Sequence, residues 1–357
     1  MNKLYISCAT LGSGGAERVI SVLSTPFADH YDTVKVCTWI TAPVFYQVDS
    51  RVEVVDIEQE SKSKSIVKKM LWFRQYIKKE SPDLLLSFLY PWSMKVLMAL
   101  AFTRVPVVVA ERQDPRIVWG GWLTKCLRHI LYLRTKGILV QTEENKQYYR
   151  GVLSNKTYAI YNPVSLAPDQ IGTALGASKT DTIVTVGRLD PAKNHFLLID
   201  AFGLFVQKHP GYQLLIYGEG PLRPTIEDYI EEKGLKGKVE LKGAKKDVIS
   251  QIISAKAFVL SSKYEGMPNA LIEAMCVGLP CISTKVSGAT ELIRSGENGI
   301  LVNDDAQQLA NALSTVIDDA SFAESLAGNA MRLYERVNLS TICKQWIDYI
   351  DSIENGL

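Results

Sequence analysis

The chain has 357 residues, more than a single hydrophobic core usually organises, so two domains are expected. With 47% hydrophobic and 22% charged residues, the composition is that of a globular protein and argues against a disordered chain. The formal net charge of only +2 argues against nucleic acid as a partner.

The first half of the chain alternates short β-rich runs with amphipathic stretches. The first run, LYISCA at 4–9, leads into a glycine turn and lacks a signal-peptide cleavage pattern, so we expect a buried strand and a cytoplasmic protein. Further strands are expected at 34–39, 52–57, 84–89, 105–110, 137–142 and 158–162, and helices at 16–27 and 65–79. The most apolar stretch, 92–110, carries Lys95, Arg104 and Pro106, and predicts a buried helix and strand rather than a membrane span.

The second half repeats this alternation with strands expected at 182–187, 213–218, 239–243, 257–262, 280–284 and 299–302. Such alternation is typical of parallel sheets covered by helices. The predicted fold class is therefore α/β, with two Rossmann-like domains facing a cleft. We expect the first domain at 1–163, a linker at 164–180, the second domain at 181–335, and a C-terminal helix at 336–357 that crosses back to the first domain.

The first glycine turn, at 12–17, superficially resembles a dinucleotide-binding fingerprint. Glu17 occupies the place of the third glycine, and no acidic residue follows the second strand to bind a ribose. The sequence therefore argues against a nicotinamide cofactor, and no cofactor is expected. The turn remains a candidate for close approach of the backbone to a ligand, with structural packing as the alternative.

Two turns of the second half lie where strands end, which is where open parallel sheets bind ligands. The turn after the strand at 182–187 carries Arg188 and Lys193, two cations that could bracket an anion. The next strand ends in a tight turn at Gly218. A solvated surface and a plain turn are the alternatives at these positions.

The segment at 262–275 is the most specific of the chain. A glycine turn follows a buried strand, Pro268 is expected to start a helix, and two acids, Glu265 and Glu273, are eight positions apart. Their spacing suits two ends of an elongated ligand better than the carboxylate pair of a retaining glycosidase. Glu273 lies among apolar residues, where a carboxylate needs hydrogen bonds. Dipole complementation by Glu265 and an ion pair of Glu273 are the alternatives.

In order and at these intervals, four motifs resemble the retaining GT-B glycosyltransferases of glycosyltransferase family 4. The motifs are GGAER at 14–18, VGRLDPAKN at 186–194, YGEGP at 217–221 and YEGMPNALIEAM at 264–275. The resemblance covers nearly the whole chain. It implies a transferase that moves a hexose or N-acetylhexosamine from a nucleotide-diphosphate donor, with UDP favoured, to a glycan or lipid-linked acceptor. The implied setting is the assembly of surface polysaccharide or glycolipid.

The same resemblance implies roles for individual residues. Arg188 and Lys193 would bind the diphosphate, Glu265 would contact the hydroxyls of the donor sugar, and Glu273 would bind the ribose. The first domain would lie on the acceptor side. Further donor contacts are expected at Gly14, Gly15, Gly218, Gly266, Met267, Pro268 and Asn269.

Neither a metal nor a protein nucleophile is required in this family, and the sequence has no Asp-x-Asp motif to hold a metal. The six cysteines lie far apart, with no nearby His pair, which predicts free thiols instead of a zinc site.

One position departs from the family pattern. Many relatives have a His beyond the strand at 105–110, whereas this chain has Glu111. We treat Glu111, together with Glu17, as a candidate contact to the sugar or the acceptor. The alternative for Glu111 is an ion pair with Arg112 or Arg116.

Two other functions fit the same architecture. A sugar-nucleotide 2-epimerase would need carboxylates and histidines in its cleft, and the chain has only four histidines. A non-catalytic nucleotide-sugar-binding protein would not need the complete set of motifs.

The stretch Ser61–Lys79 contains seven Lys and Arg residues, no acid, and interleaved apolar residues. This pattern predicts a basic amphipathic helix that could lie on an anionic membrane, at the inner face of the plasma membrane, with Trp119 and Trp122 extending the surface. A helix that packs its apolar side on the sheet is the alternative.

Overall fold

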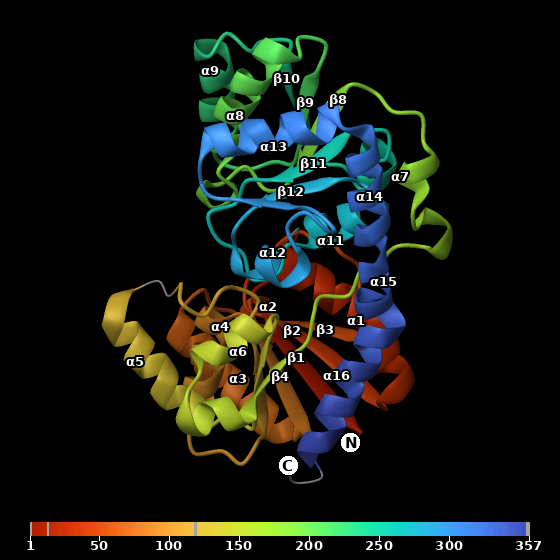
Figure 1. Cartoon of the computed structure of the whole chain (residues 1–357). Coiled ribbons are helices and arrows are strands. Elements are labelled where there is room, and N and C mark those ends of the chain that lie inside the picture. Colours follow the sequence, from red (N-terminus) through yellow and green to blue (C-terminus); the bar gives the residue numbers. More distant parts are fainter. Residues whose placement is uncertain (1, 13, 118–119, 355–357) are drawn as a thin grey trace. The chain divides into compact units, whose positions relative to one another are not determined.

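The computed structural model describes residues 2–12, 14–117 and 120–354. Internal contacts divide the chain into two compact units. Unit 1 comprises Met1–Pro163 and Leu339–Leu357, and unit 2 comprises Val164–Asn338. Figure 1 shows a parallel sheet with flanking helices in each of them.

Unit 1 contains a seven-stranded sheet in the order β3-β2-β1-β4-β5-β6-β7, and every neighbouring pair is parallel. The strands are β1 (Lys3–Cys8), β2 (Thr33–Thr38), β3 (Glu53–Asp56), β4 (Leu84–Phe88), β5 (Val107–Ala110), β6 (Gly137–Val140) and β7 (Thr157–Ala159). The helices are α1 (Gly15–His30), α2 (Ile57–Glu60), α3 (Ile66–Glu80), α4 (Tyr90–Ala99), α5 (Gly121–Tyr132), α6 (Glu143–Tyr148), the 3-10 helix η1 (Gly151–Lys156) and α16 (Leu339–Glu354). Strands β4, β5 and β6 are wholly buried, because helices cover both faces of the sheet.

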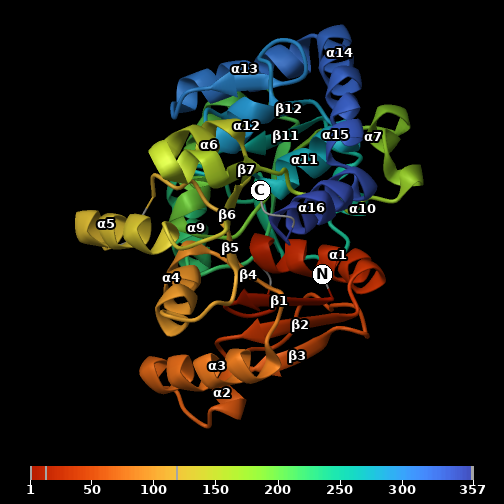
Figure 2. The ribbon, with the colours of Figure 1, turned by 90° about the horizontal axis from the view of Figure 1, so that it is seen from below.

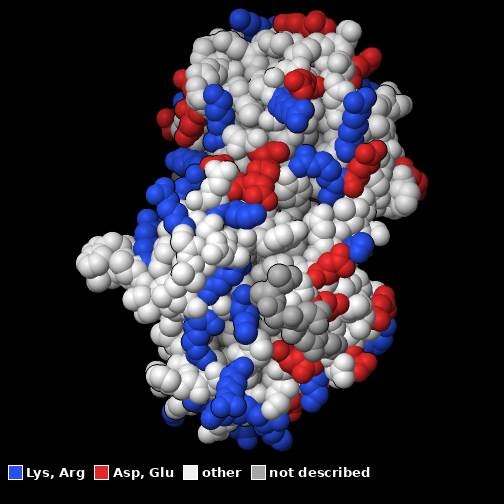
Figure 3. Space-filling view, turned by 60° about the horizontal axis from the view of Figure 1, so that its bottom comes forward, with Lys and Arg blue, Asp and Glu red and all other residues white. Residues whose placement is uncertain are grey.

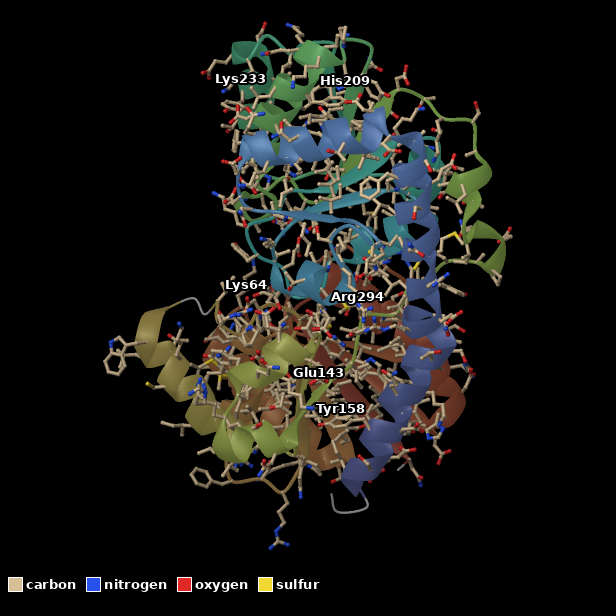
Figure 4. All side chains as sticks on the ribbon, in the orientation of Figure 1. Lys64, Glu143, Tyr158, His209, Lys233 and Arg294 are labelled. Atoms are coloured by element: carbon tan, nitrogen blue, oxygen red, sulfur yellow. The ribbon has the colours of Figure 1, made fainter. Side chains whose placement is uncertain are left out.

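Each face of this sheet has its own hydrophobic core. Figure 2 shows α1 and α16 on one side of β1–β3 and α3 on the other. On the first side, the Trp346 ring of α16 stacks on Phe88 with the ring centroids 6.0 Å apart. Figure 4 labels Tyr158 of β7, whose ring stacks on Tyr349 of α16 at 5.3 Å. The C-terminal helix is therefore an integral layer of unit 1.

Unit 2 contains a six-stranded parallel sheet in the order β10-β9-β8-β11-β12-β13. Its strands are β8 (Thr182–Val186), β9 (Gln213–Tyr217), β10 (Val239–Gly243), β11 (Ala257–Leu260), β12 (Cys281–Thr284) and β13 (Ile300–Val302). Its helices are η2 (Pro168–Gln170), α7 (Thr173–Gly176), η3 (Pro191–Lys193), α8 (His195–Lys208), α9 (Arg223–Glu232), α10 (Ile249–Ile252), α11 (Asn269–Cys276), α12 (Ser287–Leu292), α13 (Ala306–Asp318), α14 (Ala320–Ala330), η4 (Met331–Leu333) and α15 (Tyr334–Val337). Both sheets follow the doubly wound order. The predicted α/β class with two Rossmann-like units is confirmed.

The segment predicted as a linker, 164–180, is folded onto unit 2. It contains η2 and α7, and Ala174 is fully buried. The Gly172 N–H donates to the Cys276 carbonyl at 3.1 Å and the Ala174 N–H to the Val277 carbonyl at 2.9 Å. A composition rich in small residues thus reflects close packing against α11 instead of a free tether.

Within the described ranges, no helix combines the length and the apolar character that crossing a bilayer requires.

Candidate functional site

The loops after β8 and β11 meet at the centre of the sheet of unit 2. These strands are neighbours, and β9 continues the sheet on one side whereas β12 continues it on the other. Chain connections therefore diverge between β8 and β11, which makes this the topological switch point of the sheet. Ligands of doubly wound folds bind outside the carboxyl ends of the strands at this point.

Hydrogen bonds join the two loops. The Ser261 hydroxyl donates to the Lys193 carbonyl at 2.9 Å, and the Lys263 N–H donates to the Ala192 carbonyl at 2.8 Å. The Lys193 ammonium forms an ion pair with Glu265, whose Oε1 also accepts a hydrogen bond from the Ser262 hydroxyl at 2.7 Å. Two motifs that are some 70 positions apart in the sequence are thereby brought to one place.

Arg188 differs from Lys193 in its exposure. The Arg188 side chain is 71% exposed, whereas that of Lys193 is 22% exposed. The guanidinium Nε lies 3.8 Å from Asp190 Oδ2, a long contact between partly solvated groups that contributes little energy. Asp190 instead caps η3 by accepting from the Ala192 N–H at 3.0 Å. Arg188 is thus a solvent-facing cation on a loop of fixed backbone.

Two glycines after β9 allow the loop that carries Arg188 to pack closely. A Cβ on Gly218, which has a φ of +147°, would lie 1.9 Å from the Gly187 carbonyl oxygen. A Cβ on Gly220 would lie 2.4 Å from the Leu189 carbonyl oxygen. Backbone hydrogen bonds from Gly187 to Tyr217 at 2.9 Å and from Leu189 to Glu219 at 3.0 Å hold the two turns together. Gly218 therefore supports the position of Arg188 through the backbone.

Helix α11 begins at Asn269, and Pro268 is its N-cap with extended dihedral angles. Glu265 therefore lies in the preceding loop, so the span between Glu265 and Glu273 is only partly helical. Glu273 is on the helix and 3% exposed. The N-terminus of α11 is covered closely by α12, because a Cβ on Gly288 would lie 2.6 Å from the Gly266 carbonyl oxygen and 2.7 Å from the Met267 Cα.

His195, the first residue of α8, was not predicted from the sequence as a residue of the site. Its side chain is buried, and Nε2 lies 3.1 Å from the Arg188 carbonyl oxygen. Burial lowers the pKa of the imidazole, and the nearby Lys193 lowers it further. A neutral ring can donate from Nε2 to that carbonyl, which holds the loop behind Arg188. The one feature of the sequence that could have indicated a role for His195 is its position directly after the motif at 186–194.

Ser261, Ser262 and Gly288 were also not singled out. The two serines follow the buried run AFVL, and the glycine is the second residue of the short helix α12. Both patterns occur at many turns, so the sequence alone could not distinguish them from ordinary connections.

Three of the candidates in unit 1 surround the turn after β1. Gly14 is the N-cap of α1, and both Gly14 and Gly15 are exposed. Glu17 folds back over this turn, where its Oε1 accepts from the Thr10 hydroxyl at 3.3 Å. A Cβ on Gly14 would lie 2.2 Å from Glu17 Oε2, so glycine leaves room for this carboxylate.

Glu111 is part of the interior of unit 1 and is 3% exposed. Its Oε1 accepts from the Tyr132 hydroxyl at 2.7 Å and lies 3.4 Å from Arg128 Nη1. The pKa of Tyr132 is raised well above its usual value, by burial first and then by Glu111, so the phenol stays protonated and donates. In this structure the Glu111 carboxylate is bound by Tyr132 and Arg128, and its contact to the sugar or the acceptor stays a prediction.

The expected alternative partners of Glu111 were wrong. Arg116 binds Asp114 and Glu144, and Arg112 lies over the Trp346 ring at 4.8 Å. Arg112 and Arg116 are close to Glu111 in the sequence, but their side chains bind other groups. The partner of Glu111 is Arg128, which comes from helix α5. In the part of the chain that the structure describes, no three His, Cys, Asp or Glu side chains are grouped as metal ligands.

Known glycosyltransferases are similar to this chain in sequence. Residues 172–332 match the family model described as Glycosyl transferases group 1. The chain is 28% identical to the Campylobacter jejuni enzyme GalNAc-alpha-(1->4)-GalNAc-alpha-(1->3)-diNAcBac-PP-undecaprenol alpha-1,4-N-acetyl-D-galactosaminyltransferase, with 100% of both chains covered. It is 25% identical to the amylovoran biosynthesis glycosyltransferase AmsD of Erwinia amylovora, over 95% of this chain and 96% of the relative.

Among solved structures, Anabaena Alr3699/HepE in complex with UDP and glucose matches with a TM-score of 0.82 at 20% identity. The match covers 99% of this chain and 100% of that one. The two doubly wound units thus define a protein of the GT-B fold. The chain is a glycosyltransferase, and residues 172–332 carry the domain of the glycosyl transferases group 1 family.

Proposed function

We propose that the chain is a retaining glycosyltransferase that moves a hexose or N-acetylhexosamine from a UDP-sugar to a glycan or lipid-linked acceptor. The observation that supports this most directly is the convergence of the Lys193 and Glu265 loops at the switch point of unit 2. Two cations, Lys193 and the exposed Arg188, lie at this switch point together with the N-terminus of α11. In doubly wound folds this is the place where the diphosphate of a nucleotide ligand binds.

In the proposed reaction, the bond between the anomeric carbon and the β-phosphate oxygen breaks as the acceptor hydroxyl attacks on the same face. The acceptor proton passes to the departing phosphate oxygen. Arg188 and Lys193 would stabilise the charge that grows on the diphosphate, as preorganised donors do in other enzymes. In this structure Glu265 neutralises Lys193, so a diphosphate would compete for that ammonium. Glu265, with the N–H groups of Gly266 and Met267, would then be available to the sugar.

The relatives support the proposed substrates. The Campylobacter jejuni enzyme is named for transfer of N-acetylgalactosamine to an undecaprenol-linked glycan, and AmsD is named for amylovoran biosynthesis. The HepE structure contains UDP and glucose. We infer a UDP-linked donor and an acceptor in surface polysaccharide or glycolipid assembly, with Gly14 and Gly15 as further donor contacts and Glu17 as a contact to the sugar or the acceptor.

A thermal-shift panel of nucleotide sugars tests the donor. UDP-hexoses and UDP-N-acetylhexosamines are expected to raise the unfolding temperature, because a ligand at about 100 times its Kd stabilises the folded state by roughly 2.7 kcal/mol. GDP- and ADP-sugars at the same concentration serve as controls. Equal shifts with all bases would contradict a uridine-specific donor site.

Glu273 is expected to act on donor binding more than on turnover. Glu273→Gln keeps the volume of this buried side chain but removes its charge, so a ribose hydrogen bond worth about 1.5 to 3 kcal/mol becomes a neutral one worth about 0.5 to 1.5 kcal/mol. The donor KM should rise roughly tenfold or more while kcat changes less, because the ribose is remote from the breaking bond. Glu232→Gln, at the exposed end of α9, is the matched control. A kcat that falls with no change in KM would assign Glu273 a different role.

We also propose that Ser61–Lys79 contacts an anionic membrane, which would place the protein at the inner face of the plasma membrane. The exposed residues on this segment include Lys62, Lys64, Lys68, Lys78 and Lys79. Two of the cations counted in the sequence are not available for it. Lys69 is buried against Glu58 and the Trp39 carbonyl, and Arg74 donates to the carbonyls of Ala99 and Ala101. Electrostatic attraction through the remaining lysines should weaken with added salt.

A further inference from the structure

Helix α5 presents large apolar side chains to the solvent. Trp122 is 71% exposed, Leu123 63% and Ile130 64%, and Leu127 and the C-cap Leu133 are 42% and 56% exposed. Positions three and four apart share one face of a helix, so these five residues form a continuous apolar stripe. Figures 1 and 2 both show α5 projecting from the rest of unit 1.

The inward face of α5 is the polar one. Arg128 is fully buried, donates to the Pro115 carbonyl at 2.8 Å and to the Tyr148 hydroxyl at 2.9 Å, and pairs with Glu111. Tyr132, also buried, donates to the same carboxylate. These contacts fix the rotation of the helix. The apolar stripe therefore faces outward because the buried network holds the opposite face, and not because the helix lies loosely on the surface.

One further exposed apolar side chain, that of Phe102, belongs to a loop beside the C-terminal end of α5. Phe102 is 98% exposed, with a φ of 61° that a bulky residue seldom adopts. The Arg134 guanidinium donates to the Thr103 carbonyl at 2.7 Å, which ties the Phe102 loop to the residues that follow α5. The structure thus holds one more aromatic ring in solvent next to the apolar stripe.

The charges around the apolar stripe have one sign. Arg104, Lys125, Arg134 and Lys136 are exposed, and no acidic residue occurs at 84–110 or at 115–142. The acids nearest to these stretches along the chain are all engaged: Asp83 accepts from the backbone of Asn2 and Lys3, Glu111 pairs with Arg128, Asp114 and Glu144 pair with Arg116, and Glu143 pairs with Lys146. In Figure 3, uncharged atoms cover the projecting end of α5 and blue side chains lie beside it. An apolar face with a basic rim is complementary to an anionic lipid bilayer, which has an apolar interior and negatively charged headgroups.

We propose that α5 inserts its apolar stripe, together with Phe102, into the headgroup region of an anionic lipid bilayer. A second copy of the chain is a poorer occupant, because a two-fold interface would place the two basic rims against each other. Trp119 lies outside the described residues, so the surface rests on α5 itself. This inference extends the proposed action on a lipid-linked acceptor by naming the element that docks, and vesicle binding does not depend on catalysis.

Co-sedimentation of the full chain with vesicles, in the absence of donor and acceptor, tests the proposal. Vesicles of phosphatidylcholine with phosphatidylglycerol are expected to bind the chain, and phosphatidylcholine alone to bind it more weakly. Leu127→Glu and Ile130→Glu should each weaken binding about tenfold or more, because a charge replaces apolar surface that would leave water. Leu204→Glu on α8 of unit 2, where Leu204 is 37% exposed, makes the same change away from α5 and should bind as the unaltered chain does.

Cys126 supplies an independent readout. It is exposed on α5, whereas the other five cysteines are buried, so an environment-sensitive fluorophore can be attached there selectively. Its emission should shift to the blue on vesicle addition and be quenched by nitroxide-labelled lipid. Unchanged binding by both Glu variants, or a dimer that they dissociate without affecting vesicle binding, would overturn the proposal. The unaltered chain should transfer its sugar to a water-soluble acceptor, and absence of that transfer would count against the proposed function and not against lipid docking.

Discussion

Replacing Arg188 or Lys193 with alanine is expected to lower kcat by roughly a hundred- to thousandfold while changing the donor KM less. The charge that these cations meet grows as the diphosphate leaves, so they stabilise the transition state more than the bound donor. Loss of one preorganised donor in other enzymes costs about 3 to 4 kcal/mol. Arg188→Ala is the cleaner variant, because Lys193→Ala also leaves Glu265 without its ion pair.

Steady-state kinetics with varied donor measures these effects. Lys236→Ala is a suitable control, since this lysine lies near the amino end of β10, at the opposite edge of the sheet, and is 77% exposed. EDTA should leave the activity of the unaltered enzyme nearly intact, because two cations and the N-terminus of α11 are proposed to do the work of a metal. Full turnover by the Arg188→Ala, Lys193→Ala double variant, or strict dependence on an added divalent ion, would refute this assignment.

Gly218→Ala is expected to lower the transfer rate about a hundredfold and to destabilise the fold by about 2 to 5 kcal/mol. The φ of +147° is strained for alanine, and the added Cβ would lie 1.9 Å from the Gly187 carbonyl oxygen. Since that oxygen belongs to backbone, the loop carrying Arg188 has to move. A loop displaced by about 1 Å can cost a hundredfold in rate.

Gly211→Ala is the matched control for this glycine. No atom lies within 4 Å of its added Cβ, and its φ is outside the left-handed range, so stability and activity should stay close to those of the unaltered enzyme. Thermal unfolding and transfer assays of the two variants compare them directly. If Gly218→Ala behaved like Gly211→Ala, the close packing of the two turns would not support the site.

The elements of the sheets were largely predictable because buried parallel strands are continuous apolar runs. Strands such as β5, Val107–Ala110, and β11, Ala257–Leu260, contain no polar residue and are bounded by turns. The positions of the motifs after strands indicated only that their loops lie at the edge of a parallel sheet where ligands bind. The resemblance to family 4 glycosyltransferases assigned Lys193 and Glu265 to one donor site, and the structure joins their loops by hydrogen bonds and an ion pair.

Other features depend on long-range packing and could not be read from local patterns. Glu111 has two arginines within five positions, yet its partner Arg128 arrives from a helix 17 residues away. Segment 164–180 has the composition of a linker, and only its backbone contacts to α11 make it part of unit 2. The apolar stripe on α5 likewise faces the solvent because Arg128, on the opposite face of the helix, is held by buried contacts to Pro115, Tyr148 and Glu111. Periodicity identifies an amphipathic helix but does not say which face is buried.

The most direct test of the central claim follows one reaction mixture by proton NMR. An α-linked UDP-sugar that stabilises the protein in the thermal-shift panel is incubated with enzyme, first alone and then with a lipid-linked or glycan acceptor. A retaining transferase is expected to leave the UDP-sugar unchanged until the acceptor is added, and the transferred sugar should then appear with α configuration. A β-linked product would contradict the retaining mechanism, and conversion of the UDP-sugar into its 2-epimer without acceptor would contradict transfer as the function.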